Sequence, residues 1–170
     1  MKPEDLARKL RRDAAFEPAV LDRGKAVLMA AIQSAVAPRR RPTIVPQVPY
    51  SDIGAALAFL ERAFGFREIL STRLVGQGGV IHHANVEFGG GMIGIGTQGA
   101  HGAISPSVAG SASQYISVSV DDVDVHFERA RAAGARIAAG LHDEFPVRAY
   151  EALDLEGHRW RFVQWMRPAR

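Results

Sequence analysis

The 170-residue chain contains no cysteine. This absence excludes a disulfide framework, a thiolate zinc site and a cysteine nucleophile. A chain without thiols also suits a reducing compartment, so we expect the protein to be cytoplasmic.

The sequence also lacks a hydrophobic run long enough to cross a membrane, which takes about 20 residues. Its longest candidate, "AVLMAAIQSAVA" at 26–37, is shorter and includes Gln33 and Ser34. A secretion signal is disfavoured because mixed-charge residues precede this run and Pro38 follows the only small-residue cleavage pattern. We expect a helix with one apolar stripe there, and no membrane partner.

Positive charge is in excess only at the start of the chain. Residues 1–42 hold ten Lys and Arg against five Asp and Glu, whereas the remainder holds eleven against thirteen. We therefore divide the chain into a helical N-terminal extension with a basic linker, 1–42, and a globular domain, 43–170. Because the globular domain is slightly acidic, no nucleic-acid partner is expected for it. The alternative is a regulatory or interaction module that uses the basic helices.

The globular domain repeats one pattern of elements twice. The first module, 43–98, predicts a strand at 43–50, a helix at 52–64 and strands at 66–75, 80–88 and 91–97. The second, 113–166, predicts a strand at 114–120, a helix at 122–133 and strands at 136–138, 147–154 and 158–165. A loop at 98–112 connects them. The fold class is therefore α+β, built from two βαβββ modules that must pair to form a core.

Four stretches carry a resemblance to a known family: "SDIGAALAFLERAFGF", "HHANVEFGGGMIGIG", "SVSVDDVDVHFERARAAGA" and "VRAYEALDLEGHRWRF". Across residues 43–165 the sequence resembles the glyoxalase/bleomycin-resistance/dioxygenase superfamily, also called vicinal oxygen chelate proteins. The resemblance implies a cupped eight-stranded mixed sheet with helices on its convex side and a small-molecule ligand in the cup. It also implies a homodimer.

Enzymes of that family hold a divalent metal through four side chains, and the resemblance places these positions at Val45, Gly94, Tyr115 and Arg161. None of the four is a usual ligand for such an ion. A slip of one residue turns each strand to its other face and brings no histidine or carboxylate to these positions. We therefore expect no metal and no cofactor, as in the bleomycin-resistance branch. The alternative is a metal-dependent lyase, isomerase or dioxygenase whose ligands lie elsewhere.

Strand alternation predicts which residues line the cup. A two-residue turn at Gly89 and Gly90 pairs Val86 with Ile93 and Ala84 with Ile95 on the helix side. A turn at Glu156 and Gly157 would place Leu153 against Trp160 in the core and Asp154 and Arg159 toward the cup. The predicted ligand-binding residues are Gln47, His83, Asn85, Glu87, Tyr115, Ser117, Arg148, Tyr150 and Arg161.

The histidines and the other residues that could act as acid or base do not indicate a catalytic site. Glu87, His83 and Tyr150 could act as acid or base, but no nucleophile accompanies them, so binding is favoured over catalysis. His158 is expected to complete a turn, and His126 to be exposed on the second helix. His142 remains open as a loop residue beside the cup.

Overall fold

The computed structural model describes residues 42–166, together with Lys25 and Val27, which are helical. The chain divides into two units, 1–41 and 42–170, and the description below concerns the second. Apart from the helical state of Lys25 and Val27, the predicted N-terminal helices and the basic linker up to residue 41 lie outside the described residues.

The first module begins with β1 (Gln47–Tyr50) and α3 (Ile53–Phe59), which continues as a π-helical turn, η1 (Leu60–Phe64). Asp52 caps the helix by accepting a hydrogen bond from the Ala55 amide, and Gly65 ends it with a φ of 76°. The predicted strand at 66–75 is interrupted, and the module continues through five further elements: β2 (Arg67–Glu68), η2 (Leu70–Thr72), β3 (Leu74–Val75), η3 (Gln77–Gly79) and β4 (Ile81–Phe88). It closes with β5 (Gly91–Thr97).

The linker and the second module follow the same order. Two short helices, η4 (Ala100–Gly102) and α4 (Pro106–Ala109), lie in the predicted loop. The module itself comprises β6 (Tyr115–Ser119), α5 (Val123–Ala132), β7 (Arg136–Glu144), β8 (Val147–Leu153) and β9 (Arg159–Trp165). Asp122 caps α5 as Asp52 caps α3, which confirms the repeat inferred from the two aspartates.

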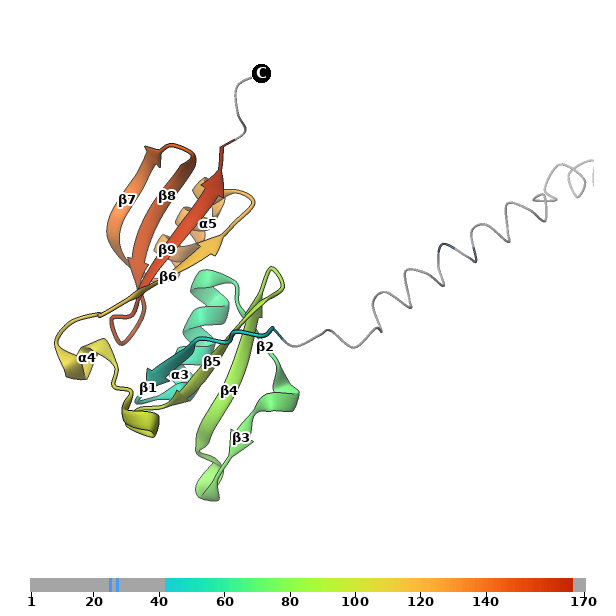
Figure 1. The fold of residues 1–170 in the computed structure, drawn as a ribbon, viewed down its shortest axis with the longest axis vertical. Helices are drawn as coiled ribbons and strands as arrows, with labels where there is room; N and C mark the ends of the chain where they lie inside the picture. The colour runs from blue at the N-terminus through green and yellow to red at the C-terminus, as the bar shows by residue number, and fades with distance from the viewer. Residues whose placement is uncertain (1–24, 26, 28–41, 167–170) are drawn as a thin grey trace, which may run out of the picture. The chain divides into compact units, whose positions relative to one another are not determined.

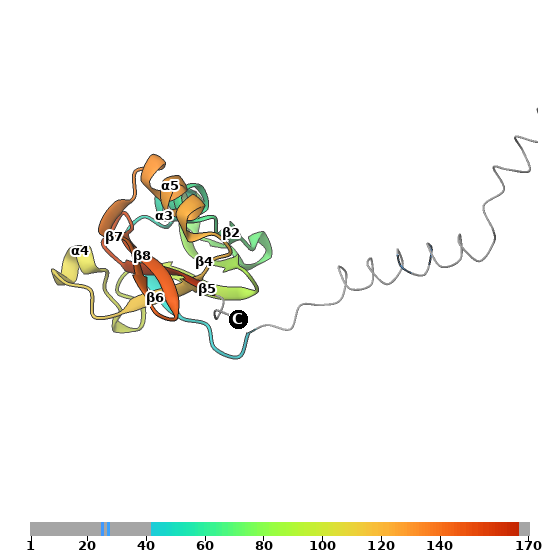
Figure 2. The same cartoon turned by 90° about the horizontal axis from the view of Figure 1, so that it is seen from above.

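The strands form two mixed sheets, which corrects the prediction of one continuous eight-stranded sheet (Figures 1 and 2). The first sheet has the order β1-β5-β4-β2, with β3 also paired to β4, and the second has the order β6-β9-β8-β7. The strand pairs β1-β5 and β6-β9 are parallel, whereas the other strand pairs are antiparallel. Within residues 42–166 no ladder joins the two sheets, so β1 and β6 are edge strands.

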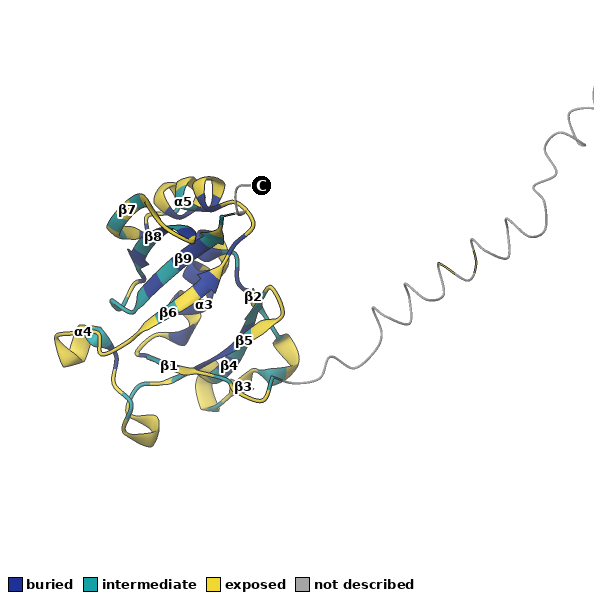
Figure 3. Cartoon of the chain, turned by 45° about the horizontal axis from the view of Figure 1, so that its top comes forward, coloured by how far each residue is buried: buried dark blue, intermediate teal, exposed yellow. Residues whose placement is uncertain are grey.

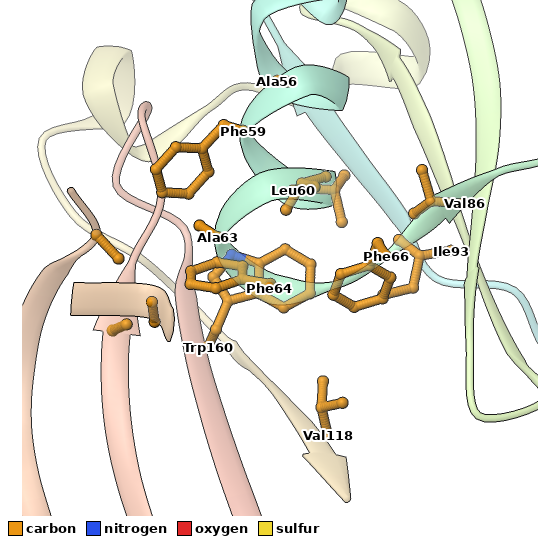
Figure 4. Packing of buried hydrophobic residues seen from close by; sticks show 14 of the residues in the cluster. Ala56, Phe59, Leu60, Ala63, Phe64, Phe66, Val86, Ile93, Val118 and Trp160 are labelled. Carbon is orange, nitrogen blue, oxygen red and sulfur yellow. The ribbon is translucent and has the colours of Figure 1, made fainter. Parts of the chain in front are cut away.

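The helix sides of both sheets close on one shared core (Figure 4). The Phe64 ring centroid lies 5.6 Å from that of Trp160 and 4.9 Å from that of Phe162, so the end of the first helix packs on the second sheet. The ring centroids of Phe66 and Trp160 lie 5.3 Å apart, with the two rings in an edge-on arrangement. Figure 3 shows α3 between the two sheets, with buried residues on the facing sides. The other face of each sheet, here called its cup face, therefore points away from the core.

Strand pairing confirms the predicted register in the first module. Val86 pairs with Ile93 and Ala84 with Ile95, and all four are buried. Gly89 and Gly90 form the turn with φ of 55° and 88°, values that suit a two-residue hairpin of type I′.

In the last hairpin the predicted register is wrong by one residue. Leu153 pairs with Arg159 and Ala152 with Trp160, because the turn spans 154–158 and is longer than two residues. The Asp154 carboxylate holds this longer turn by accepting hydrogen bonds from the backbone amides of Glu156 and His158, both at 3.0 Å. Consequently the even-numbered residues of β8 face the core, and the odd-numbered ones lie on the cup face.

Candidate functional site

A row of three residues crosses the middle of the first sheet's cup face. Gln47 on β1 and Asn85 on β4 are both paired with Gly94 on β5. The Gln47 amide occupies the space above this glycine, since a Cβ at Gly94 would lie 2.2 Å from Gln47 Oε1. The position where the family resemblance requires a metal ligand therefore has no side chain of its own and is covered by an amide.

Neighbouring rows of the same face carry the other predicted residues. His83 is paired with Gly96, where an added Cβ would meet nothing within 4 Å, so the space above this glycine is open. Glu87 lies next to Arg67 of β2 and accepts a hydrogen bond from its Nε at 2.9 Å. Glu87 is thus part of an ion pair.

The cup face of the second sheet combines hydroxyl groups with two ion pairs. Tyr115 and Ser117 of β6 are paired with Arg159 and Arg161 of β9, respectively, and both β6 residues are exposed. Arg159 donates to Glu151 at 2.5 Å, and Arg161 pairs with Glu144 of β7. Both arginines are therefore partly neutralised before any ligand binds.

A small apolar floor lies under the Arg161–Glu144 pair. Val147, Ala149 and Val163 are buried on this face, separate from the main core. Arg161 is paired with Glu151, whereas Glu144 is paired with Val147 further along β8. The Arg161 side chain therefore extends along the strand, over the floor, to reach its partner.

Two predicted ligand-binding residues lie on the opposite side of the second sheet, which corrects their assignment. Tyr150 is fully buried, and its hydroxyl donates to His126 Nδ1 at 2.7 Å. Arg148 binds Asp124 of α5 at 2.9 Å and Asp143 at 2.7 Å. Both predictions failed for the same reason, namely the longer turn at 154–158, which inverts the parity of β8. They are structural residues of the helix side.

His126 is also buried, against expectation. Its Nε2 lies 3.1 Å from the Phe64 carbonyl, so Nε2 carries the proton and Nδ1 accepts from Tyr150. Burial lowers the pKa of His126, partly opposed by the hydrogen bond to Phe64, and burial likewise raises the pKa of Tyr150. The pair is a neutral, satisfied core contact between helix and sheet.

Asp154 was predicted to face the cup and instead lies buried in the last turn. Its carboxylate accepts hydrogen bonds from the Tyr50 hydroxyl, from Trp160 Nε1 at 2.9 Å and from His158 Nδ1 at 3.1 Å. Burial alone would raise the pKa of Asp154, but the hydrogen bonds from His158, Tyr50 and Trp160 hold it below its ordinary value. This carboxylate joins β1 to β9.

The side chains at the four positions where the resemblance implies metal ligands do not fit a resident metal ion. At the four positions that the resemblance implies, an amide covers Gly94, an arginine stands at Arg161, and Val45 and Tyr115 supply no usual ligand. In the part of the chain that the structure describes, no three His, Asp or Glu side chains are grouped to hold an ion. Nor does any helix there have the length and apolar composition needed to span a bilayer.

Comparison with known proteins agrees with this fold. Residues 43–162 match the model of the Glyoxalase/Bleomycin resistance protein/Dioxygenase superfamily. The crystal structure of TioX from Micromonospora sp. ML1 is 35% identical, with a TM-score of 0.62, over 74% of this chain and 99% of that one. An uncharacterized protein of Mycobacterium tuberculosis H37Rv is 29% identical over 131 residues, 74% of this chain and 76% of its own. The fosfomycin resistance protein FosX of Listeria monocytogenes, 16% identical with a TM-score of 0.54 over 74% of this chain and 93% of its own, shares the fold.

Two βαβββ modules, each with a mixed sheet whose polar face points away from a shared core, define this class of protein. The chain belongs to the glyoxalase/bleomycin-resistance/dioxygenase superfamily.

Sequence reasoning placed Gln47, His83, Asn85, Glu87, Tyr115, Ser117 and Arg161 on cup faces, and the structure has them there. The first four lie on one sheet and the last three on the other. It missed Glu144 and Glu151, the partners of the cup arginines. Glu144 lay beyond the short strand predicted at 136–138, and Glu151 was turned inward by the wrong hairpin register. Of these two glutamates, only Glu151 could have been identified from the sequence. It precedes Arg159 by eight residues across a predicted hairpin, a spacing that brings opposite charges together.

Proposed function

We propose that the protein binds a small organic molecule on its cup faces without a metal ion. The observation that carries this proposal is the Gln47 amide over Gly94, at a position where metal-dependent relatives need a ligand. The surrounding groups, Asn85, His83 and Ser117, supply hydrogen-bond donors and acceptors. Tyr115 adds an exposed aromatic face for stacking.

The two cup-face arginines, Arg159 and Arg161, indicate which kind of ligand the protein could bind. Because Arg159 and Arg161 already pair with carboxylates, a ligand with an anionic or carbonyl oxygen would compete with Glu151 or Glu144 for them. Displacing Glu144 would also uncover the apolar floor of Val147, Ala149 and Val163. An aromatic molecule that carries such an oxygen matches both features.

A homodimer is part of the same proposal. Both β1 and β6 are edge strands, and the cup-facing residues Tyr115, Ser117 and Ser119 along β6 are exposed. A second copy of the chain could cover these edges and faces, since exposed edges otherwise invite uncontrolled pairing. The cysteine-free sequence is consistent with a cytoplasmic site of action.

The test is a thermal-shift screen of the full chain with divalent metals and with aromatic and phosphonate-like compounds. A compound present at about 100 times its Kd should stabilise the fold by about 2.7 kcal/mol, which raises the melting temperature by several degrees. Ser117→Trp, which fills the cup face, should abolish this rise. Val125→Trp, an equal substitution at an exposed position of α5, should leave it intact.

Two results would overturn the proposal. One is about one equivalent of tightly bound metal on which the melting temperature depends, which would favour the metal-dependent enzyme. The other is a compound-induced rise that Ser117→Trp leaves unchanged, because the ligand would then lie elsewhere.

A further inference from the structure

His158 holds a buried nitrogen that the fold does not use. Among the described residues, His158 Nε2 is the one buried side-chain nitrogen or oxygen without a hydrogen-bond partner. The side chain is 11% exposed, and the Asp154 carboxylate that it contacts is 1% exposed. Buried polar groups are nearly always paired, so an unpaired one indicates a missing partner.

The protonation of the imidazole follows from its neighbours. Asp154 is an acceptor, because it also takes hydrogen bonds from the Tyr50 hydroxyl and from Trp160 Nε1. His158 Nδ1, at 3.1 Å and 3.2 Å from the two carboxylate oxygens, must therefore carry a proton. In the neutral ring Nε2 then presents a lone pair, and the negative charge of Asp154 makes that lone pair a stronger acceptor.

His158 is one of the residues that line a cavity of about 380 Å³. The first module contributes Gln47 and Pro49, and the second contributes Gln114. The linker contributes mostly small residues, which are Gly102, Ala103, Ile104, Pro106, Ala109, Ser111, Ala112 and Ser113. A cavity of about 150 Å³ can hold benzene, so this one has room for a single substituted ring.

We propose that this cavity is a second ligand site, in which His158 Nε2 accepts a hydrogen bond from a weakly acidic hydroxyl group, such as that of a phenol or an enol. The lone pair requires a donor, and the apolar linker residues favour the ring that carries it. Nε2 is shielded from solvent, so a donor reaches it only after a small shift of the cavity wall. Once made, the bond is strengthened by the low local dielectric.

This site shares Gln47 with the cup face of the first sheet, but its key residue, His158, lies in the turn before β9 and not on a cup face. The two proposals can therefore fail separately. The Ser117→Trp variant tests ligand binding on the cup faces, whereas the NMR signals of the His158 ring test binding at the present site.

The experiment compares phenol with anisole on the full chain, since anisole keeps the ring and lacks the donor. Binding is followed by NMR of the imidazole nitrogens and carbon-bound protons of His158. Phenol should bind about fivefold more tightly than anisole, the equivalent of one hydrogen bond of about 1 kcal/mol. It should also shift the Nε2 resonance, which anisole should not.

Two variants separate this site from a general effect on the turn. His158→Phe keeps a ring and removes the nitrogen, so the preference for phenol, followed by titration of the backbone amide resonances of 102–113, should vanish. Tyr50→Phe removes another donor to Asp154 without touching Nε2, so the preference should persist. Circular dichroism confirms that each variant is folded.

Equal binding of phenol and anisole to the wild-type chain would overturn the proposal, because Nε2 would then bind nothing but water. A preference for phenol that survives in His158→Phe, or an unmoved Nε2 resonance at saturating phenol, would overturn it as well.

Discussion

A single carboxylate organises the end of the second module. Asp154 accepts hydrogen bonds from three side chains and two backbone amides, so one residue ties together a turn, the first strand and the core tryptophan. Sequence reasoning saw the acidic residue but assigned it to the cup. A five-residue turn stabilised by its own aspartate cannot be distinguished from a shorter one without knowing the partners that pack around it.

We expect Asp154→Asn to lower the free energy of unfolding by about 2 to 4 kcal/mol. The amide keeps one acceptor oxygen and turns a donor toward buried donors, which leaves several of them unpaired. Tyr50→Phe, which removes one donor only, should cost about 1 kcal/mol. Urea unfolding followed by tryptophan fluorescence measures both values, and equal losses in the two variants would contradict the central role of Asp154.

The buried His126 predicts a pH dependence of stability. Its pKa is lowered in the folded protein, so the unfolded chain takes up the proton first, near pH 6.5. Stability from this group is therefore complete above about pH 6.5 and is lost as the pH falls toward the lowered folded pKa. Urea unfolding at pH 7.5, 6.5 and 5.5 should show this loss, and His126→Gln should reduce it. The exposed His142→Gln is the control and should retain the wild-type slope.

At the scale of elements, the two long helices and the β4–β5 hairpin are determined by residues close together in the sequence. The Asp caps of α3 and α5, the spacing of apolar residues and the Gly89–Gly90 turn are all local signals, and the structure confirms these elements. The interrupted strand at 66–75 and the long, bulged β7 were not predicted correctly. Their pairing depends on contacts with β4 and β8, far away in sequence.

The Gly89–Gly90 turn can be strengthened. Gly89→Asn should raise the free energy of unfolding by about 0.4 to 1 kcal/mol, because asparagine tolerates the positive φ of 55° and has fewer unfolded conformations than glycine. No atom lies within 4 Å of an added Cβ at this position, so no clash opposes the gain. Gly89→Val should destabilise instead, since a β-branched residue is strained there. A lower urea midpoint for Gly89→Asn would contradict the prediction.

At the scale of the whole molecule, the buried hydrophobic residues of the described domain all lie between Val48 and Val163. The two modules share this core, and their cup faces point away from it. Residues before Pro42 form a separate unit. We therefore expect the domain to fold on its own.

Deletion of residues 1–41 should leave the free energy of unfolding of the domain within about 1 kcal/mol of its original value, since no described core residue is removed. A larger loss in urea unfolding would contradict this. Sedimentation of the same variant tests the extension: a dimer lost on deletion makes it an assembly arm. Loss of salt-sensitive nucleic-acid binding alone would instead support the regulatory alternative.

The sequence by itself determined the repeated module, the helix caps and the first hairpin register, because each depends on residue type and short spacing. Its resemblance to the family also identified the four positions where usual metal ligands are missing. Only the tertiary structure decided the division into two sheets, the helix-side position of Arg148 and Tyr150, the ion pairs of the cup arginines and the unpaired nitrogen of His158. These depend on which distant side chains meet. A register shift of one residue inverts an entire strand, and only the packing of Asp154 between β1 and β9 specifies it.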